Sequence, residues 1–413
     1  MNKVEIMSPA GSFESLNAAI NAGANSVYFG VEQLNMRARS TNNFTINDLD
    51  EIIRLCKRRN VKTYLTVNTL IYDHDINLMK KICDAAKSTG VNAIIASDMA
   101  VISYVNSIGM PIHISTQLNV SNIEAVKFYS KFADAIVLAR ELNLNQIKNI
   151  CETIKKENIT GFSGDLLKIE IFAHGALCVA IAGKCYMSLA TLNASANRGA
   201  CLQPCRRAYK VTDEETGDEL ILDNKYVMSP KDLCTIGFLD KILDSGISLL
   251  KIEGRGRAAD YVFTVTKTYR EAIDCYYKKD YDENKIQKWM EELQSVYNRG
   301  FWNGGYYLGN QLGEWSGTYG SKATNEKNYI GFVNNYYNQI NVAEFKLEAG
   351  EIEQGDKILI TGNATGVVET IADGLMANYI KVEYAKKGDI ITLKLDNKVR
   401  KNDKLYVIKK KIG

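Results

Sequence analysis

The chain has 413 residues, of which 46% are hydrophobic and 24% are charged, and its formal net charge at pH 7 is +3. These values suit a water-soluble protein with two domains or one large domain plus an appendage, and they neither demand nor exclude nucleic acid as a partner. We find no secretory signal and no run of about 18 uncharged apolar residues, so we expect a cytoplasmic protein without a membrane span. Nine cysteines, an odd number, argue against a disulfide framework in such a protein.

Short apolar segments alternate with helix-like segments through the first two thirds of the chain. The segments that predict strands are residues 4–8, 26–31, 62–68, 93–97, 112–119, 135–140, 168–173 and 248–253. The segments that predict helices include residues 15–23, 46–59, 76–90, 100–109 and 259–277. Eight strands separated by helices indicate parallel pairing, and that number favours a (β/α)₈ TIM-like barrel over an open doubly wound sheet.

Helical periodicity ends at about residue 325, and short β-rich segments follow. They are residues 329–333, 339–345, 356–360, 366–371, 379–382, 389–395 and 404–408, most of them separated by Gly or Asn turns. We therefore expect two domains, an α/β TIM-like barrel over residues 1–325 and a small antiparallel β-barrel over residues 326–413. A cysteine-rich region, residues 174–234, is inserted in the first.

Five of the nine cysteines fall between positions 178 and 234. Four of them, Cys178, Cys185, Cys201 and Cys205, follow the seventh predicted strand within 28 residues. Thiolates bind zinc or an iron–sulfur cluster, and the long spacings before Cys201 suit a cluster held by several loops better than a zinc knuckle. Cys234 is the alternative fourth ligand, although its surroundings read as the start of a helix. Because the carboxyl ends of parallel barrel strands carry active sites, we expect this region to be chemically active.

The segment EIFAHGALCVAIAGKCYMS, residues 170–188, resembles the signature of peptidase family U32. The segments SPAG (8–11), NRGACLQPCR (197–206), SPKDL (229–233) and KIEGR (251–255) are similar to that family and stand in its order. Within the family, the chain looks most like the proteins that hydroxylate a tRNA uridine.

This resemblance implies a [4Fe–4S] cluster on Cys178, Cys185, Cys201 and Cys205. It also implies formation of 5-hydroxyuridine at the wobble position of tRNA, with prephenate as the hydroxyl source. The C-terminal domain is similar to the β-barrels of translation factors, which would suit contact with tRNA. Further partners that the resemblance suggests are a second U32 chain and proteins of iron–sulfur assembly or electron transfer.

Other polar residues follow predicted strands. We assign catalytic roles to His174, Glu253 and Arg255, which lie at the ends of the seventh and eighth strands. The residues that we expect to contact substrate are Asn68, Gln117, Arg198, Arg206, Arg207 and Arg257. The alternatives are a structural histidine at 174, an ion pair of the strand-end arginines with Glu253, plain solvated charge, and supporting hydrogen bonds from the two amides.

Two other functions remain open at this level. The first is a peptidase or collagenase-like protease, as the family name says, but the sequence contains neither a His-Glu-x-x-His motif nor an evident pairing of a nucleophile with one of its three histidines. The second is a non-catalytic RNA-binding protein with a structural zinc ion. Iron and sulfide content separates the cluster from the zinc alternative.

Overall fold

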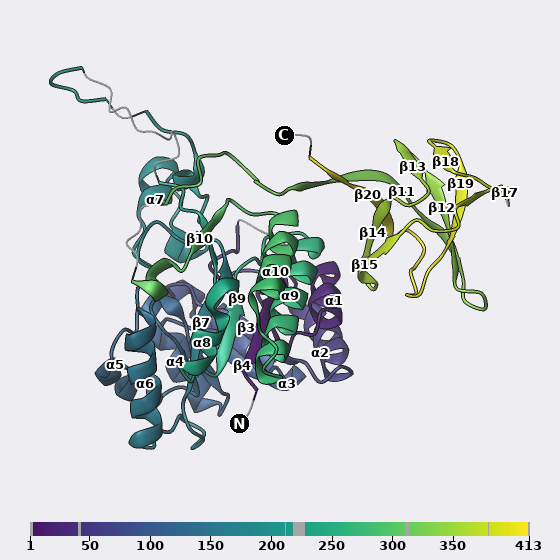
Figure 1. Ribbon diagram of the computed structural model, residues 1–413. Helices are drawn as coiled ribbons and strands as arrows, with labels where there is room; N and C mark the ends of the chain where they lie inside the picture. The colour runs from purple at the N-terminus through teal and green to yellow at the C-terminus, as the bar shows by residue number, and fades with distance from the viewer. Residues whose placement is uncertain are drawn as a thin grey trace.

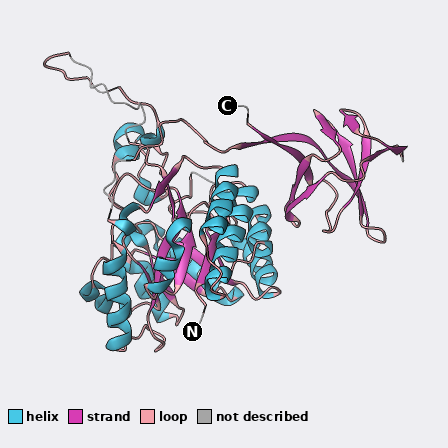
Figure 2. Cartoon of the chain, in the orientation of Figure 1, coloured by secondary structure: helices cyan, strands magenta, loops and turns pink. Residues whose placement is uncertain are grey.

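The structure of the protein is a computed structural model. It describes residues 3–39, 43–210, 212–217, 228–309, 314–378 and 380–411. Figure 1 shows a helix-covered barrel and, beside its helix α1, a C-terminal region made of strands. Figure 2 shows helices around the strands of the first part. The described residues of the C-terminal part form strands and loops without a helix.

Within the described residues, eight parallel strands close into a barrel, as predicted. They are β1 (Glu5–Pro9), β2 (Ser26–Phe29), β3 (Lys62–Val67), β4 (Ala93–Ala96), β5 (Ile112–Ile114), β6 (Ala135–Val137), β7 (Lys168–Gly175) and β9 (Leu249–Ile252). The barrel closes because β9 pairs with both β1 and β7. Strand β5 is shorter than predicted, since the chain turns into a 3₁₀ helix at Thr116–Leu118.

Successive side chains of each barrel strand point to opposite sides, and the apolar side chains on the outer side pack against the helices. In β3, Leu65 and Val67 join the large core between strands and helices, whereas Tyr64 packs in a separate cluster with residues of β1, β2, β4 and β9. The covering helices are α1 (Phe13–Asn21), α2 (Leu49–Lys57), α3 (Ile76–Thr89), α4 (Met99–Ser107), α5 (Ile123–Ser130), α6 (Leu144–Lys156), α8 (Leu239–Asp244), α9 (Ala259–Tyr277) and α10 (Glu283–Ser295). Helix α1 begins at a capping box on Ser12. No helix in the described part of the chain is both long and apolar enough to cross a membrane.

The inserted cysteine-rich region adds structure at the end of β7. It contains helix α7 (Met187–Leu192) and strand β8 (Asp232–Cys234), which pairs antiparallel with His174 and Gly175. Strand β10 (Phe301–Asn303) then pairs parallel with β8. Cys234 itself lies in β8, and the helical segment that its surroundings indicate begins two residues later, with a 3₁₀ helix at Ile236–Phe238 that leads into α8. The apolar neighbours of Cys234 belong to a strand that lies on the barrel rim and to the helix that follows.

The C-terminal region is rich in antiparallel strands, as predicted. One sheet has the order β15-β14-β20-β11-β12-β19-β16-β17, and β13 pairs with β18. The strands are β11 (Asn325–Tyr337), β12 (Val342–Leu347), β13 (Glu351–Glu353), β14 (Lys357–Gly362), β15 (Gly366–Ile371), β16 (Met376–Ala377), β17 (Ile380–Lys381), β18 (Tyr384–Lys386), β19 (Ile390–Lys394) and β20 (Lys404–Lys410). Residue 379 of the strand predicted over 379–382 lies outside the described residues.

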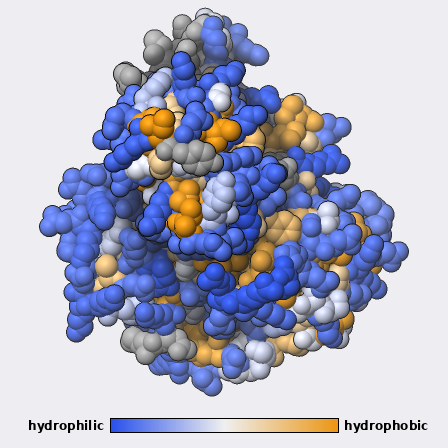
Figure 3. All heavy atoms as spheres, turned by 90° about the vertical axis from the view of Figure 1, so that its right-hand side faces the viewer, coloured by the Kyte–Doolittle hydropathy of each residue, from blue (hydrophilic) through white to orange (hydrophobic). Residues whose placement is uncertain are grey.

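The two parts have separate cores and share a small contact. Leu359 and Val367 of the C-terminal sheet pack with Ala18 of α1 and Ala259 of α9. The side-chain amide of Asn17 donates to the carbonyl oxygen of residue 363 at 2.7 Å. The side of the molecule drawn in Figure 3 is mostly hydrophilic, with small separate hydrophobic patches.

Candidate active site

A cavity of about 210 Å³ opens at the carboxyl ends of the barrel strands. Asn68 follows β3, Gln117 follows β5 and Arg140 follows β6, and all three line this cavity. The chain segment after β7 supplies much of the opposite wall. The arrangement places the predicted site at the face where this barrel fold carries active sites.

The structure brings the four clustered cysteines together. Cys178, Cys185, Cys201 and Cys205 all line the cavity. Burial raises the pKa of the Cys205 thiol, and negative charge on the other three thiols raises it further, while Arg206 lowers it. The other three thiols therefore lie near enough to act on Cys205. In this arrangement, no three His, Cys, Asp or Glu side chains of the described residues are close enough together to hold a metal ion.

Glycine shapes the loops that carry these thiols. Gly175 ends β7 with a φ of +108°, and a Cβ atom at this position would lie 2.4 Å from the carbonyl oxygen of Glu253. At Gly199 a Cβ atom would lie 2.6 Å from the carbonyl oxygen of Asn35, and φ is +83°. A larger residue at either position would push the cysteine-bearing segment away from the barrel rim.

Cys234, the alternative fourth ligand, lies apart from this group. Its side chain is buried in β8, near Tyr269 of α9, and does not line the cavity. Burial raises the pKa of this thiol to about 12. A protonated, buried thiol at this place fits a packing role.

Arg255 is buried at the cavity wall with neutral partners. Its Nη1 donates to the Thr66 hydroxyl at 2.8 Å and its Nη2 donates to the side-chain oxygen of Asn35. Burial lowers its pKa to about 10. Gly30 makes room for this guanidinium, because a Cβ atom there would lie 2.6 Å from Nη1.

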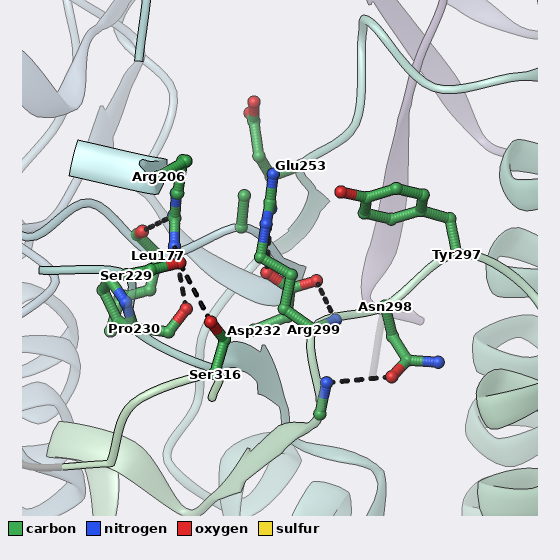
Figure 4. A network of polar contacts seen from close by, with 12 residues as sticks. Leu177, Arg206, Ser229, Pro230, Asp232, Glu253, Tyr297, Asn298, Arg299 and Ser316 are labelled. Atoms are coloured by element: carbon green, nitrogen blue, oxygen red, sulfur yellow. Dashed lines mark hydrogen bonds and ion pairs between the residues drawn. The ribbon is translucent and has the colours of Figure 1, made fainter. Parts of the chain in front are cut away.

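Two more arginines reach the cavity with neutral partners. Arg140 donates to the carbonyl oxygen of residue 176 at 3.2 Å and lies over the Phe172 ring at 3.9 Å. Arg206 donates to the Ser229 hydroxyl at 3.1 Å and to the carbonyl oxygens of Pro230 and Leu177, as Figure 4 shows.

None of these three guanidinium groups, those of Arg140, Arg206 and Arg255, forms an ion pair with a carboxylate among the described residues. Burying a cation without a counter-charge is costly. The cavity therefore offers positive charge that an anionic ligand would neutralise.

Glu253 is the carboxylate among the residues that line the cavity. It accepts from Arg37 Nη2 at 3.1 Å and from the Tyr28 hydroxyl at 3.2 Å. Burial by itself would raise the pKa of Glu253, but the charges of Arg37, Arg140 and Arg255 bring it below the ordinary value. Glu253 is thus ionised at neutral pH, and its charge is paired with that of Arg37.

A buried ion pair lies inside the barrel beneath this rim. Lys251 Nζ, which also lines the cavity, is 2.8 Å from Glu170 Oε1, and His113 Nδ1 is 3.1 Å from Glu170 Oε2. Burial favours the neutral acid, but Lys251 and His113 outweigh it and lower the pKa of Glu170 to about 2.

Sequence reasoning missed Arg37, Arg140, Lys251 and Tyr28 as cavity residues. Arg140 carried a usable signal because it ends a predicted strand, and Lys251 carried a weaker one because it is a charged residue within a short apolar strand. Arg37 carried none, since it stands in a polar segment between β2 and α2 without regular spacing.

The predicted amides lie where expected. Asn68 accepts from the backbone N–H of Met36 at 3.3 Å and donates to the Ser115 hydroxyl at 3.3 Å. Gln117 hydrogen-bonds with Ser115 and packs against Gly183 of the cysteine-bearing segment. Both side chains therefore face the cavity and also tie its walls together.

Three predicted substrate arginines lie outside the cavity. Arg198 is paired with Asp75 and stacks on the Tyr72 ring at 4.1 Å, so it fastens the cysteine-rich segment to the β3–α3 loop. Arg257 stacks on the Tyr297 ring at 3.5 Å. Arg207 is exposed and lines a neighbouring groove.

His174 also lies outside the cavity. Its ring centroid is 5.4 Å from that of Phe301 and 5.6 Å from that of Tyr269, in a buried aromatic cluster. Burial lowers its pKa to about 3. A neutral, enclosed imidazole gives our prediction of a catalytic proton donor no support.

The low pKa of His174 predicts acid sensitivity. An unfolded histidine binds a proton below pH 6.5 and the folded His174 does not, so stability falls as pH drops from 6.5 toward 3. We expect His174 alone to make the protein about 2 kcal/mol less stable at pH 5 than at pH 8. Urea unfolding of wild type and His174→Phe at both pH values measures this difference. An identical pH dependence of the two proteins would contradict it.

Comparison with known proteins places the chain in a family. A family model described as peptidase family U32 matches residues 11–317. A protein of Porphyromonas gingivalis named collagenase is 54% identical over 406 residues, 98% of both chains. The tRNA hydroxylation protein P1 of Bacillus subtilis is 31% identical over 414 residues, 96% of this chain and 93% of that one. The 23S rRNA 5-hydroxycytidine C2501 synthase of Escherichia coli is 34% identical over 66% of this chain and 40% of its own length. The chain belongs to peptidase family U32.

Proposed function

We propose that this protein is an iron–sulfur-dependent RNA-modifying enzyme that hydroxylates a uridine of tRNA at C5, at the wobble position, with prephenate as the hydroxyl source. The observation that carries this proposal is the cavity itself. Four cysteine thiols and three arginines without carboxylate partners line the same space at the carboxyl ends of the barrel strands. Relatives named for tRNA and rRNA hydroxylation support it.

The donor set suits a [4Fe–4S] cluster. Such a cluster takes four thiolates, and Cys178, Cys185, Cys201 and Cys205 supply four around one cavity. When bound, the cluster would supply redox or Lewis-acid chemistry. Replacement of the uridine C–H bond by C–OH removes two electrons from the base, and prephenate, as the donor of the hydroxyl group, would be the co-substrate that takes up these electrons. The chain's own residues hold the reactants and exclude water.

The cationic residues suit a small dianion. Prephenate carries two carboxylates, and a guanidinium group binds a carboxylate through two parallel hydrogen bonds. Arg140 and Arg255 present guanidinium groups without ion-pair partners, whereas Arg37 is held by Glu253, which also accepts from the Tyr28 hydroxyl. Asn68 and Gln117 offer amides for the edge of a pyrimidine.

The collagenase name of one relative raises a peptidase as the second candidate. Nucleophilic peptidases need a base beside the attacking hydroxyl or thiol, most often histidine. The chain has three histidines. His113 and His174 are buried in the barrel and in the aromatic cluster, His74 is exposed, and none lines the cavity. The geometry therefore favours RNA hydroxylation.

Iron content and tRNA composition test the proposal. We expect protein purified without oxygen to contain about four iron and four sulfide per chain and to absorb visible light. We expect a strain that lacks the protein and its paralogues to lose 5-hydroxyuridine derivatives from bulk tRNA. An iron-free protein with one bound zinc ion, or release of peptides from collagen by the pure protein, would contradict the proposal.

A further inference from the structure

A second hollow, here called the outer groove, adjoins the cysteine cavity. Its volume is about 490 Å³, and its lining includes Cys201, Gln203, Arg206, Arg207, Arg299 and the rings of Tyr297 and Tyr319. Cys201, Gln203 and Arg206 line both spaces. A polymeric ligand bound in the outer groove could therefore place one of its side groups in the cavity.

The outer groove is positively charged. Three arginines line it, and none of its lining residues is Asp or Glu. Arg299 is held rigidly, because its backbone N–H and its Nη1 both approach the buried carboxylate of Asp232, at 3.2 and 3.4 Å (Figure 4). Arg206 keeps neutral partners only, and Arg207 is exposed without a side-chain hydrogen bond or ion pair in the described part of the chain. Arg206 and Arg207 thus have no carboxylate ion-pair partner among the described residues.

Two tyrosine rings, those of Tyr297 and Tyr319, line the outer groove together with the arginines. Tyr319 is 74% exposed although it lines the groove, so its face is free for a planar ligand. Tyr297 is fixed by Arg257, which stacks on its ring at 3.5 Å. Guanidinium groups next to an exposed aromatic ring are the pattern by which proteins bind single-stranded nucleic acid, with phosphates on the cations and bases on the rings.

We propose that the outer groove binds the single-stranded RNA nucleotides that flank the target base, with phosphates on Arg206 and Arg207 and a neighbouring base stacked on Tyr319. This inference rests on the proposed function and assigns it a substrate path. A target nucleotide must leave its stack to reach a cavity at the barrel end. The adjoining groove holds its neighbours while the base enters past Cys201 and Gln203.

Binding of a fluorescent 12-nucleotide oligouridine to the full-length protein at several salt concentrations tests the groove without requiring catalysis. We expect Arg207→Glu to weaken binding about 10-fold and to reduce the salt dependence, since one phosphate contact is lost. We expect Tyr319→Ala to weaken binding about 10-fold with the salt dependence unchanged, because stacking releases no counterions. Both side chains are exposed, so neither change threatens folding.

Arg59→Glu is the matched control, because Arg59 is exposed just before β3, at the opposite end of the barrel. It should leave binding unchanged. Wild-type affinity in both groove variants would overturn the groove assignment and leave the proposed function standing. A wild-type protein that binds neither oligouridine nor tRNA would overturn both. Binding of a Gly- and Pro-rich collagen peptide that the same variants abolish, with RNA binding intact, would assign the groove to peptide instead.

Discussion

Under the proposed function, replacing Cys205 by alanine is expected to remove most of the iron from anaerobically purified protein and to lower tRNA hydroxylation at least about 100-fold. A cubane cluster that loses one of four thiolates exposes an iron to solvent and loses the geometry that its protein imposes. Cys205 is half-buried beside the other three thiols, whose charges act on its own ionisation. The measurements are iron and sulfide per chain, the visible spectrum, and 5-hydroxyuridine formed in tRNA.

Cys234→Ala supplies the matched control. Cys234 is a fully buried thiol of the same chain, but it lies in β8 outside the cavity. We expect this variant to keep its iron and its visible spectrum, with only the small loss of stability that follows removal of a buried sulfur atom. Loss of iron in Cys234→Ala together with retention in Cys205→Ala would make Cys234 the fourth ligand and contradict our assignment.

The barrel could be predicted because each of its strands is a short apolar segment with a helix after it. Eight such segments were visible in the sequence and all eight pair in the barrel. Strands β8 and β10 escaped prediction because they form only on the rim of a finished barrel, where pairing with β7 and with each other holds these short segments extended. In the C-terminal region, β13, β16 and β18 were also missed, because they have only three, two and three residues and no local pattern marks them.

Four residues chosen because they follow or end predicted strands line the cavity, namely Asn68, Gln117, Glu253 and Arg255, and their roles there stay predictions. His174, chosen in the same way, does not line it. The pairing of β7 with β9 shifts register between Phe172 and His174, so the alternation of side chains breaks at that point. Phe172 faces the cavity and the imidazole turns into the aromatic cluster. A bulge depends on the neighbouring strand, and no local pattern in the sequence shows it.

Which cations are paired with carboxylates could also not be predicted from the sequence. The segment KIEGR shows two cations and one acid, but not that Lys251 pairs with Glu170 from β7 while Arg255 has only neutral partners. Partners contributed by other strands decide which cation is free to bind a ligand. The sequence could therefore identify candidates, and only the three-dimensional arrangement separates structural charges from those available to a substrate.

Replacing Lys251 by methionine is expected to destabilise the folded protein by about 3–5 kcal/mol at pH 7, because it leaves the Glu170 carboxylate buried beside His113 without its cation. Urea unfolding measures this change. Lys62→Met is the matched control. Lys62 pairs with Glu5 at 2.7 Å, but its side chain is 50% exposed, so we expect a loss below about 1 kcal/mol.

The dependence of this loss on pH follows from the pKa of Glu170. In the wild type that pKa is lowered to about 2, so the pair contributes its full stability above pH 4.5 and loses it as pH falls from 4.5 through 2. In Lys251→Met the main lowering charge is gone and burial raises the pKa, so the carboxyl binds a proton in mild acid and its burial becomes less costly. The stability difference between variant and wild type should therefore shrink from pH 7 to pH 5. A constant difference over that range would show that the methionine disturbs packing and that the charge of Glu170 is not the cause.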